Sequence, residues 1–275
     1  MHFNKFTNQA AYNTGKYNMD FPAVALVGTD IVYNPDPIID YSKQYLTFEA
    51  LTNGSIFWYA DQGAEIYPVI QYSINGGSWT NLQASVTGAG SDGILVSSGD
   101  VVRIKGSLSS TLIGDGSFVV FSCTANCNVF GNIKSLQYGD NFEGKIDSVY
   151  YPLLFNSCAG LISAEHLVLP STTVISDTYG SYYSMFSGCT SLTITPTIPH
   201  VTATIGSVVY ALSGMFYGCT SLRKVTCLLQ GTGLSLDVWL SGVSATGTFV
   251  KAADASWVSG ENGIPNGWTV QNAVS

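Results

Sequence analysis

One eight-residue phrase occurs three times in this chain and constrains the fold more than any other feature. Its copies begin at Leu154, Met185 and Met215, and each contains a Leu-Phe or Met-Phe pair followed by a cysteine and then a leucine. The cysteines lie 31 and 30 residues apart. Self-similarity at such a period is typical of repeat proteins, in which each unit buries its apolar face by stacking on the next. The phrase therefore predicts a short solenoid, which is a scaffold for presenting a surface.

Within each copy, the apolar residues predict a short helix followed by a strand. An aromatic or aliphatic residue three positions before the Leu/Met-Phe pair, such as Tyr151, gives the i, i+3, i+4 spacing of a helix with one buried side. Gly188 and Gly218 stand where such a helix would end in a residue of positive φ, and Ser157 replaces the glycine in the first copy. The apolar series that follows contains prolines, which suit an edge or irregular strand.

The side chains that recur at equivalent positions form the predicted core of the repeats. They are Phe155, Cys158, Leu161, Met185, Phe186, Cys189, Leu192, Met215, Phe216, Cys219 and Leu222. Three of the six cysteines belong to this set, where a free thiol behaves as a small buried hydrophobic group. A local disulfide between Cys123 and Cys127 stays open as an alternative. The chain has only three histidines, and no second cysteine pair supports a zinc site.

The chain before and after the repeats divides into three further parts. Residues 1–40 hold one apolar run, which suits an anchoring or docking segment as well as an ordinary first strand. Residues 41–128 contain short apolar segments with turn residues between them, including Asn75-Gly76-Gly77 as a hairpin turn, and predict a β-sandwich-like module. The repeats then occupy residues 129–237 and a C-terminal cap occupies 238–275. In the cap, the apolar run 238–240 is either a subunit contact or core.

Charge and composition exclude several classes of function. Ten Lys and Arg residues in a chain of net charge −8 do not form the basic surface that nucleic acid binding requires. No apolar stretch is long enough to span a membrane, and the first residues lack the pattern of a secretory signal, so we expect neither membrane insertion nor Sec-type export.

No motif of a known catalytic or cofactor site is found. Acidic residues such as Glu165 and Asp177 are scattered and do not pair as in a glycosidase. No Gly-x-Ser-x-Gly turn accompanies His166 or His200. We therefore expect no enzyme activity, and no catalytic, cofactor-binding or metal-binding residues.

Two tyrosines are candidate ligand-binding residues. Tyr217 stands where the earlier copies have Asn156 and Ser187, so it should face solvent, and Tyr179 lies close to the second copy. Exposed tyrosines can stack on sugars or anchor protein interfaces.

Three further motifs carry a resemblance to a known family. They are Gly131-Asn132-Ile133-Lys134-Ser135-Leu136, the Tyr-Ser-x-Asn-Gly-Gly-x-Trp pattern at residues 72–79, and the ending from Gly247 to Val270. With the Cys-Thr-Ser-Leu repeats, they resemble the BspA-like leucine-rich repeat proteins of gut Bacteroidetes and their phages, over about residues 46–270. The resemblance implies a mainly β fold with short helices, in which a β-sandwich-like module precedes a short leucine-rich repeat solenoid.

The same resemblance implies surface display and adhesion, and it supplies no catalytic residue. The expected function is that of a non-enzymatic structural protein of a phage particle, a head fibre or capsid decoration rather than a tail fibre. It would bind other virion proteins through residues 1–40, form a dimer or trimer, and contact glycans of the host or of mucus. The alternatives are an adhesin on the bacterial cell surface and a carbohydrate-binding protein, which would carry a row of exposed aromatic side chains.

Overall fold

The computed structural model describes residues 39–60, 67–86, 93–108, 118–145, 151–170, 182–200, 212–230, 234 and 236–274, together with the backbone of a short hairpin formed by β1 (Ala25–Val27) and β2 (Asp30–Val32). These parts are mainly β. Their helices are short: η1 (Tyr41–Lys43), α3 (Ser135–Tyr138) and η2 (Gly139–Asn141). The docking role predicted for residues 1–40 falls almost entirely outside the fully described residues.

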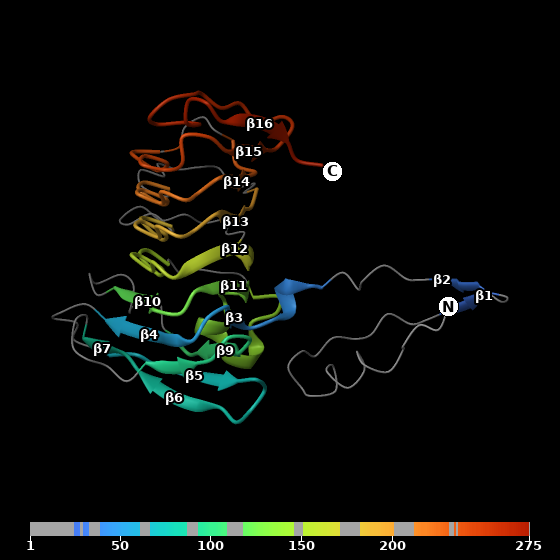
Figure 1. Ribbon diagram of the computed structural model, residues 1–275, viewed down its shortest axis with the longest axis vertical. Helices are drawn as coiled ribbons and strands as arrows, with labels where there is room; N and C mark the ends of the chain where they lie inside the picture. Colours follow the sequence, from blue (N-terminus) through green and yellow to red (C-terminus); the bar gives the residue numbers. More distant parts are fainter. Residues whose placement is uncertain are drawn as a thin grey trace.

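A ten-stranded sheet runs through the described body of the molecule. Its order is β16-β15-β14-β13-β12-β11-β3-β9-β5-β6. The bounds are β3 (Leu46–Ala50), β5 (Val69–Ile74), β6 (Thr80–Gln83), β9 (Val101–Gly106), β11 (Cys127–Asn132), β12 (Leu161–Val168), β13 (Ile194–Ile198), β14 (Lys224–Cys227), β15 (Thr248–Lys251) and β16 (Thr269–Asn272). The strands from β11 to β16 are parallel and stacked in chain order (Figure 1).

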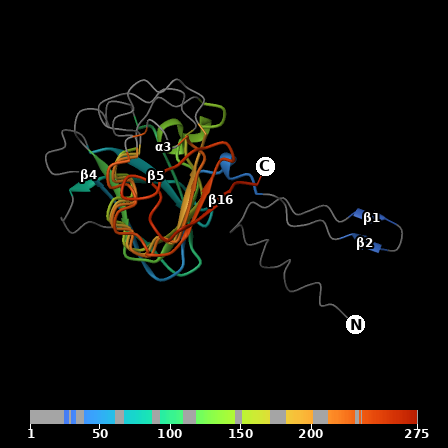
Figure 2. The same ribbon diagram turned by 90° about the horizontal axis from the view of Figure 1, so that it is seen from above.

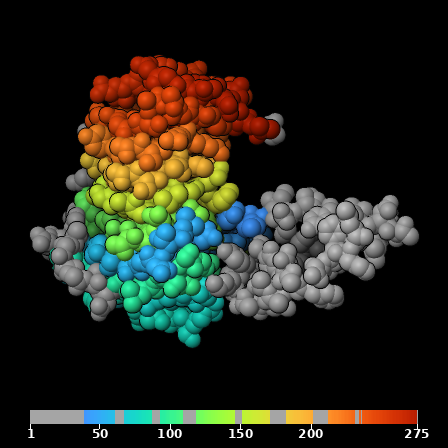
Figure 3. All heavy atoms as spheres, in the orientation of Figure 1, coloured from blue at the N-terminus to red at the C-terminus, as the bar shows by residue number. Residues whose placement is uncertain are grey.

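Strand β11 joins the two halves of this sheet. It pairs antiparallel with β3 on one side and parallel with β12 on the other. The boundary predicted between residues 128 and 129 therefore lies inside a strand that belongs to both halves. The space-filling view shows the parallel part rising in tiers from the N-terminal module (Figure 3).

A smaller sheet covers one face of the module. Strand β4 (Gly54–Ala60) pairs with β10 (Val119–Cys123), with β8 (Ile94–Val96) and with β7 (Ser85–Val86). The two sheets meet through aromatic rings, since Phe121 of β10 lies 5.3 Å from Phe48 of β3, measured between ring centroids. Within the smaller sheet, Trp58 of β4 lies 4.5 Å from Phe121. These rings are part of the buried core of the module.

The hairpin turn predicted at Asn75-Gly76-Gly77 is confirmed. Asn75 and Gly76 both have positive φ, and the Gly77 N–H donates to the Ile74 carbonyl, as in the tight turns that match the twist of a hairpin. The Asn75 side chain donates to Asp100 and accepts from the Val101 N–H. The Asn-Gly-Gly part of the motif is thus explained by the turn and its anchoring.

The motif at residues 131–136 is explained in the same way. Gly131 has a φ of 83°, and a Cβ placed there would lie 2.0 Å from the Tyr45 carbonyl oxygen. Ser135 is fully buried, and its hydroxyl donates to the Ile104 carbonyl and accepts from the Leu46 N–H. The motif fixes α3 against β3 and β9.

The helix expected at the start of each copy is wrong. Residues 152–157, 182–188 and 212–218 form consecutive turns, which we call the turn segments. Residues of left-handed conformation recur four positions apart, as at Ser184 (φ 49°) and Gly188 (φ 74°), and an α-helix does not accommodate them. The inward spacing that resembled a helix comes from these turns.

Backbone hydrogen bonds connect each turn segment to the next copy. The Phe155 N–H donates to the Met185 carbonyl, and the Phe186 N–H donates to the Met215 carbonyl, both at 2.9 Å. Bonds within a helix would have used these donors inside one copy. Here they hold neighbouring copies together, and the view along the stack shows the coils lying over one another (Figure 2).

A fourth turn segment, at residues 237–242, continues the stack past the predicted boundary at residue 237. The Phe216 N–H donates to the Trp239 carbonyl, so Trp239 takes the place that Met185 and Met215 have in the earlier copies. Trp239 and Leu240 are both buried. Of the two interpretations of residues 238–240, the structure supports core.

Candidate interaction surface

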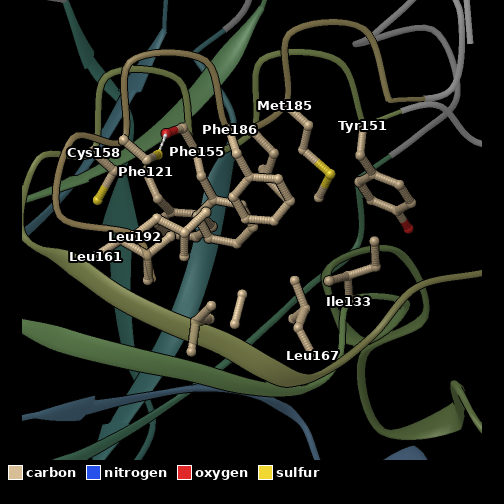
Figure 4. Packing of buried hydrophobic residues seen from close by; sticks show 14 of the residues in the cluster. Phe121, Ile133, Tyr151, Phe155, Cys158, Leu161, Leu167, Met185, Phe186 and Leu192 are labelled. Atoms are coloured by element: carbon tan, nitrogen blue, oxygen red, sulfur yellow. Dashed lines mark hydrogen bonds between the residues drawn. The ribbon is translucent and has the colours of Figure 1, made fainter. Parts of the chain in front are cut away.

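The predicted core residues of the repeats are all inside the molecule. Each of the eleven is fully buried. The rings of Phe121, Phe155 and Phe186 follow one another through the interior, with Leu161, Leu192 and Met185 beside them (Figure 4). None of these side chains is placed to contact a ligand at the surface.

The thiols of Cys158, Cys189 and Cys219 are buried at equivalent positions of successive copies. All six cysteines are free and buried, including Cys123 and Cys127, for which a local disulfide was the alternative. The Cys189 and Cys219 thiols donate to the carbonyls of Phe155 and Phe186, both at 3.0 Å.

Burial keeps the thiols of Cys189, Cys219 and Cys227 protonated. It raises the pKa of Cys219 and of Cys227 to about 12, and raises the pKa of Cys189 well above its ordinary value. A buried, protonated thiol is a poor nucleophile. The arrangement is that of core packing.

Tyr217 projects from the third turn segment. Its side chain is 51 % exposed, whereas Asn156 and Ser187 at the equivalent positions are partly buried. Within the described ranges no other tyrosine, phenylalanine or tryptophan is as exposed, so those ranges hold a single exposed aromatic side chain and not a row. The second candidate, Tyr179, lies outside the described residues.

The outer face of the large sheet carries a cluster of rings that the sequence did not reveal. Phe130 of β11 and His166 of β12 are opposite each other in the parallel register. Tyr41 of η1 stacks on His166, with 4.5 Å between ring centroids and 4° between planes, and meets Phe130 edge-on at 5.6 Å. We call these three residues the ring cluster.

The ring cluster has acidic neighbours. Burial raises the pKa of Tyr41, and the negative charges of Glu49 and Glu165 raise it further, so the phenol stays protonated. Glu165 is itself paired with Lys224, whose Nζ lies 2.6 Å from its Oε1. Glu165 is thus part of an ion pair across the sheet between β12 and β14.

A second polar cluster lies on the N-terminal module. The Tyr45 hydroxyl donates to Asp140, which also receives the Lys105 ammonium group at 2.8 Å. The Lys105 Nζ lies over the ring of Trp79, 4.3 Å from its centroid. Trp79 is the last residue of the Tyr-Ser-x-Asn-Gly-Gly-x-Trp motif. Burial and the hydrogen bond to Asp140 raise the pKa of Tyr45 to about 12. One face of Trp79 is therefore occupied by Lys105.

The ring cluster had no signal in the sequence. Tyr41 is far from Phe130 and His166 along the chain, and none of the three belongs to a motif. The rings come together only because β11 and β12 pair in this register and η1 packs on both strands. The exposed position of Tyr217, in contrast, could be inferred by aligning the copies.

Within the described residues, no three His, Cys, Asp or Glu side chains come together in a way that could hold a metal ion. No helix in the described part of the chain is both long and apolar enough to cross a membrane.

Comparisons of the chain with protein-family models, with curated proteins and with solved structures give no match.

Proposed function

We propose that this chain is a non-enzymatic display protein of a phage particle, a head fibre or capsid decoration that carries a short leucine-rich repeat solenoid of the BspA-like type. The observation that carries the proposal is the unbroken connection between module and repeats. One sheet passes from β6 to β16, and backbone hydrogen bonds join each turn segment to the next. Such a connection suits a rigid arm that holds a surface away from its point of attachment.

The point of attachment in this proposal is the N-terminal segment, residues 1–40. The described chain begins on the outer face of the sheet, where Tyr41 stacks on His166. The Asn132 side chain also donates to the Ser42 carbonyl, which holds the next residue in place. A force applied to the N-terminal segment would therefore reach the sheet at β11 and β12, in the middle of the ten strands.

The displayed surface in this proposal is the parallel stack with its exposed Tyr217. Only 10 % of the residues are charged, and most of the turn residues near Tyr217 are small or polar. Such a surface suits contact with host or mucus glycans through hydrogen bonds and one stacking aromatic group.

The experiment is mass spectrometry of purified phage particles from a matching host culture. The expected result is peptides of this chain at a fixed ratio to the major capsid protein. Recovery only in the outer-membrane fraction of the host would overturn the virion assignment in favour of a bacterial adhesin. A variant lacking residues 1–40 should be missing from particles, and undiminished incorporation would contradict the docking role.

A further inference from the structure

Strand β16 ends the ten-stranded sheet, and its outer edge is open in the described structure. It pairs with β15 alone, and all four of its residues are exposed. Figure 1 shows it at the top of the parallel stack.

The backbone groups of β16 alternate between the two edges. The Thr269 N–H donates to the Gly247 carbonyl and the Ala273 N–H donates to the Lys251 carbonyl, so the odd-numbered residues face β15. In a parallel pair, the N–H and C=O of one residue point the same way, and the next residue points the opposite way. Val270 and Asn272 therefore direct their backbone donors and acceptors outward.

This edge lacks the features that usually prevent strand pairing. Natural edges carry charges, prolines or bulges. The sequence Thr269-Val270-Gln271-Asn272 contains no charge and no proline, and its register with β15 is regular. Val270 is 45 % exposed. The chain as a whole has a net charge of −8. Because β16 itself carries no charge, two copies of this strand can approach without repulsion between like charges on the strand.

We propose that two copies of this chain associate through β16, paired antiparallel about a two-fold axis. When Val270 of one copy lies opposite Asn272 of the other, every outward N–H and C=O of the two residues finds a partner. The two-fold axis repeats this pair, which gives four hydrogen bonds from one self-complementary register. Gln271 then lies opposite itself. The inference gives the proposed homo-oligomer a specific interface, and it does not depend on where the protein resides.

The register can be tested with engineered cysteines. At Gln271 the two copies form a non-hydrogen-bonded pair with about 4.5 Å between Cα atoms, within reach of a disulfide. Thr269 lies opposite Ala273, so two cysteines at 269 would be separated by about 13 Å along the strands. Under mild oxidation in native buffer, Gln271→Cys should give a covalent dimer on a non-reducing gel, and Thr269→Cys should not. The unmodified chain, oxidised in the same way, shows whether its six buried thiols form any cross-link on their own.

A second variant tests the hydrogen bonds. Val270→Pro removes an outward donor that β15 does not use, so it should abolish dimers in light scattering. Val258→Ser changes an exposed valine outside the strand and should leave them. The proposal is overturned if the protein is monomeric at all concentrations, if Thr269→Cys cross-links as readily as Gln271→Cys, or if the assembly is open-ended, as pairing of β16 with β6 would produce.

Discussion

The rings of Phe155 and Phe186 lie nearly parallel, with 12° between their planes and 5.2 Å between their centroids. Phe186 and Phe216 repeat the relationship at 14° and 5.5 Å. Because the same residue type occupies the same place in successive copies, each ring covers the next and excludes water from the interior. The column continues to Phe121 at one end and to Trp239 at the other. It therefore connects the module, the repeats and the residues after them.

The central position of this column predicts a large loss of stability on truncation. Phe186→Ala removes a fully buried ring that has partners on both sides, and we expect the free energy of unfolding to fall by about 3–5 kcal/mol. Phe186→Leu should cost less because it fills part of the space. Urea unfolding followed by circular dichroism measures both. Tyr217→Ala truncates an exposed ring on the third turn segment, so it should change the free energy of unfolding by only about 0.5 kcal/mol. Equal losses for the two alanine variants would contradict the column.

The left-handed positions of the turn segments predict that two substitutions change the stability in opposite directions. Gly188 has a φ of 74°, and an added Cβ would lie 3.1 Å from the Ser157 hydroxyl oxygen. Gly188→Ala should therefore destabilise the protein by about 1–2 kcal/mol.

Ser157 is the matched control, since it occupies the same place in the first copy with a φ of 57°. Ser157→Gly relieves its left-handed strain, and the added freedom of the unfolded chain offsets part of the gain. We expect a small rise in the thermal midpoint. A rise for Gly188→Ala, or a clear loss for Ser157→Gly, would be inconsistent with these conformations.

Burial of the thiols predicts a loss of stability at alkaline pH. In the unfolded chain a cysteine ionises near pH 9, whereas burial raises the pKa of Cys219 and of Cys227 to about 12 in the folded protein. Their contribution is thus fully present below pH 9. Between about pH 9 and 12 only the unfolded chain releases these protons, so the free energy of unfolding should fall by about 1.4 kcal/mol per pH unit for each thiol.

The variant Cys227→Ala separates this effect from other alkaline changes. It should be less stable at neutral pH because it leaves a small cavity, yet its stability should fall less steeply above pH 9. Guanidinium titrations at pH 7, 9 and 10 supply the three points required. An unchanged slope would mean that the thiol ionises equally in both states.

The predictability of the fold differs between its parts for physical reasons. The repeat period, the buried side chains and the Asn75-Gly76 turn could be inferred because each depends on residues close in sequence or on equivalent positions in successive copies. The helices were wrong because Tyr151, Leu154 and Phe155 have helical spacing, whereas the left-handed residues direct the backbone N–H groups to the next copy. Ser184, Leu153 and Val238 give no such signal, since a left-handed conformation is uncommon for these residue types.

Neither the role of Trp239 nor the ring cluster could be inferred from residues that are close in the sequence. The spacing from Met215 to its equivalent Trp239 is shorter than the repeat period, so the fourth turn segment cannot be recognised from the period in the sequence. Tyr41, Phe130 and His166 meet only through the tertiary path of the chain. Residues that become neighbours through strand register leave no periodic pattern in the sequence.

The stacking of Tyr41 on His166 predicts how firmly the N-terminal segment is held. Lys43 has an exposed side chain and lies in η1, which packs on β11 and β12. Tyr41→Ala removes the ring that fixes η1, and a loss of about 1–2 kcal/mol would raise the open population about 5- to 30-fold. Trypsin should then cut after Lys43 faster by about the same factor, which mass spectrometry of the fragments would measure.

Two comparisons make this result specific to the ring cluster. His166→Ala removes the other ring and should accelerate the same cut, whereas Tyr217→Ala, on a turn segment, should leave its rate unchanged. Cleavage after Lys134, whose side chain donates to the Lys145 carbonyl, serves as the internal reference for general loosening. If the cut after Lys43 and the cut after Lys134 accelerate together, the variant has destabilised the whole module. If neither changes in Tyr41→Ala, contacts other than the stacked rings hold η1, and the ring cluster is not the anchor of the segment.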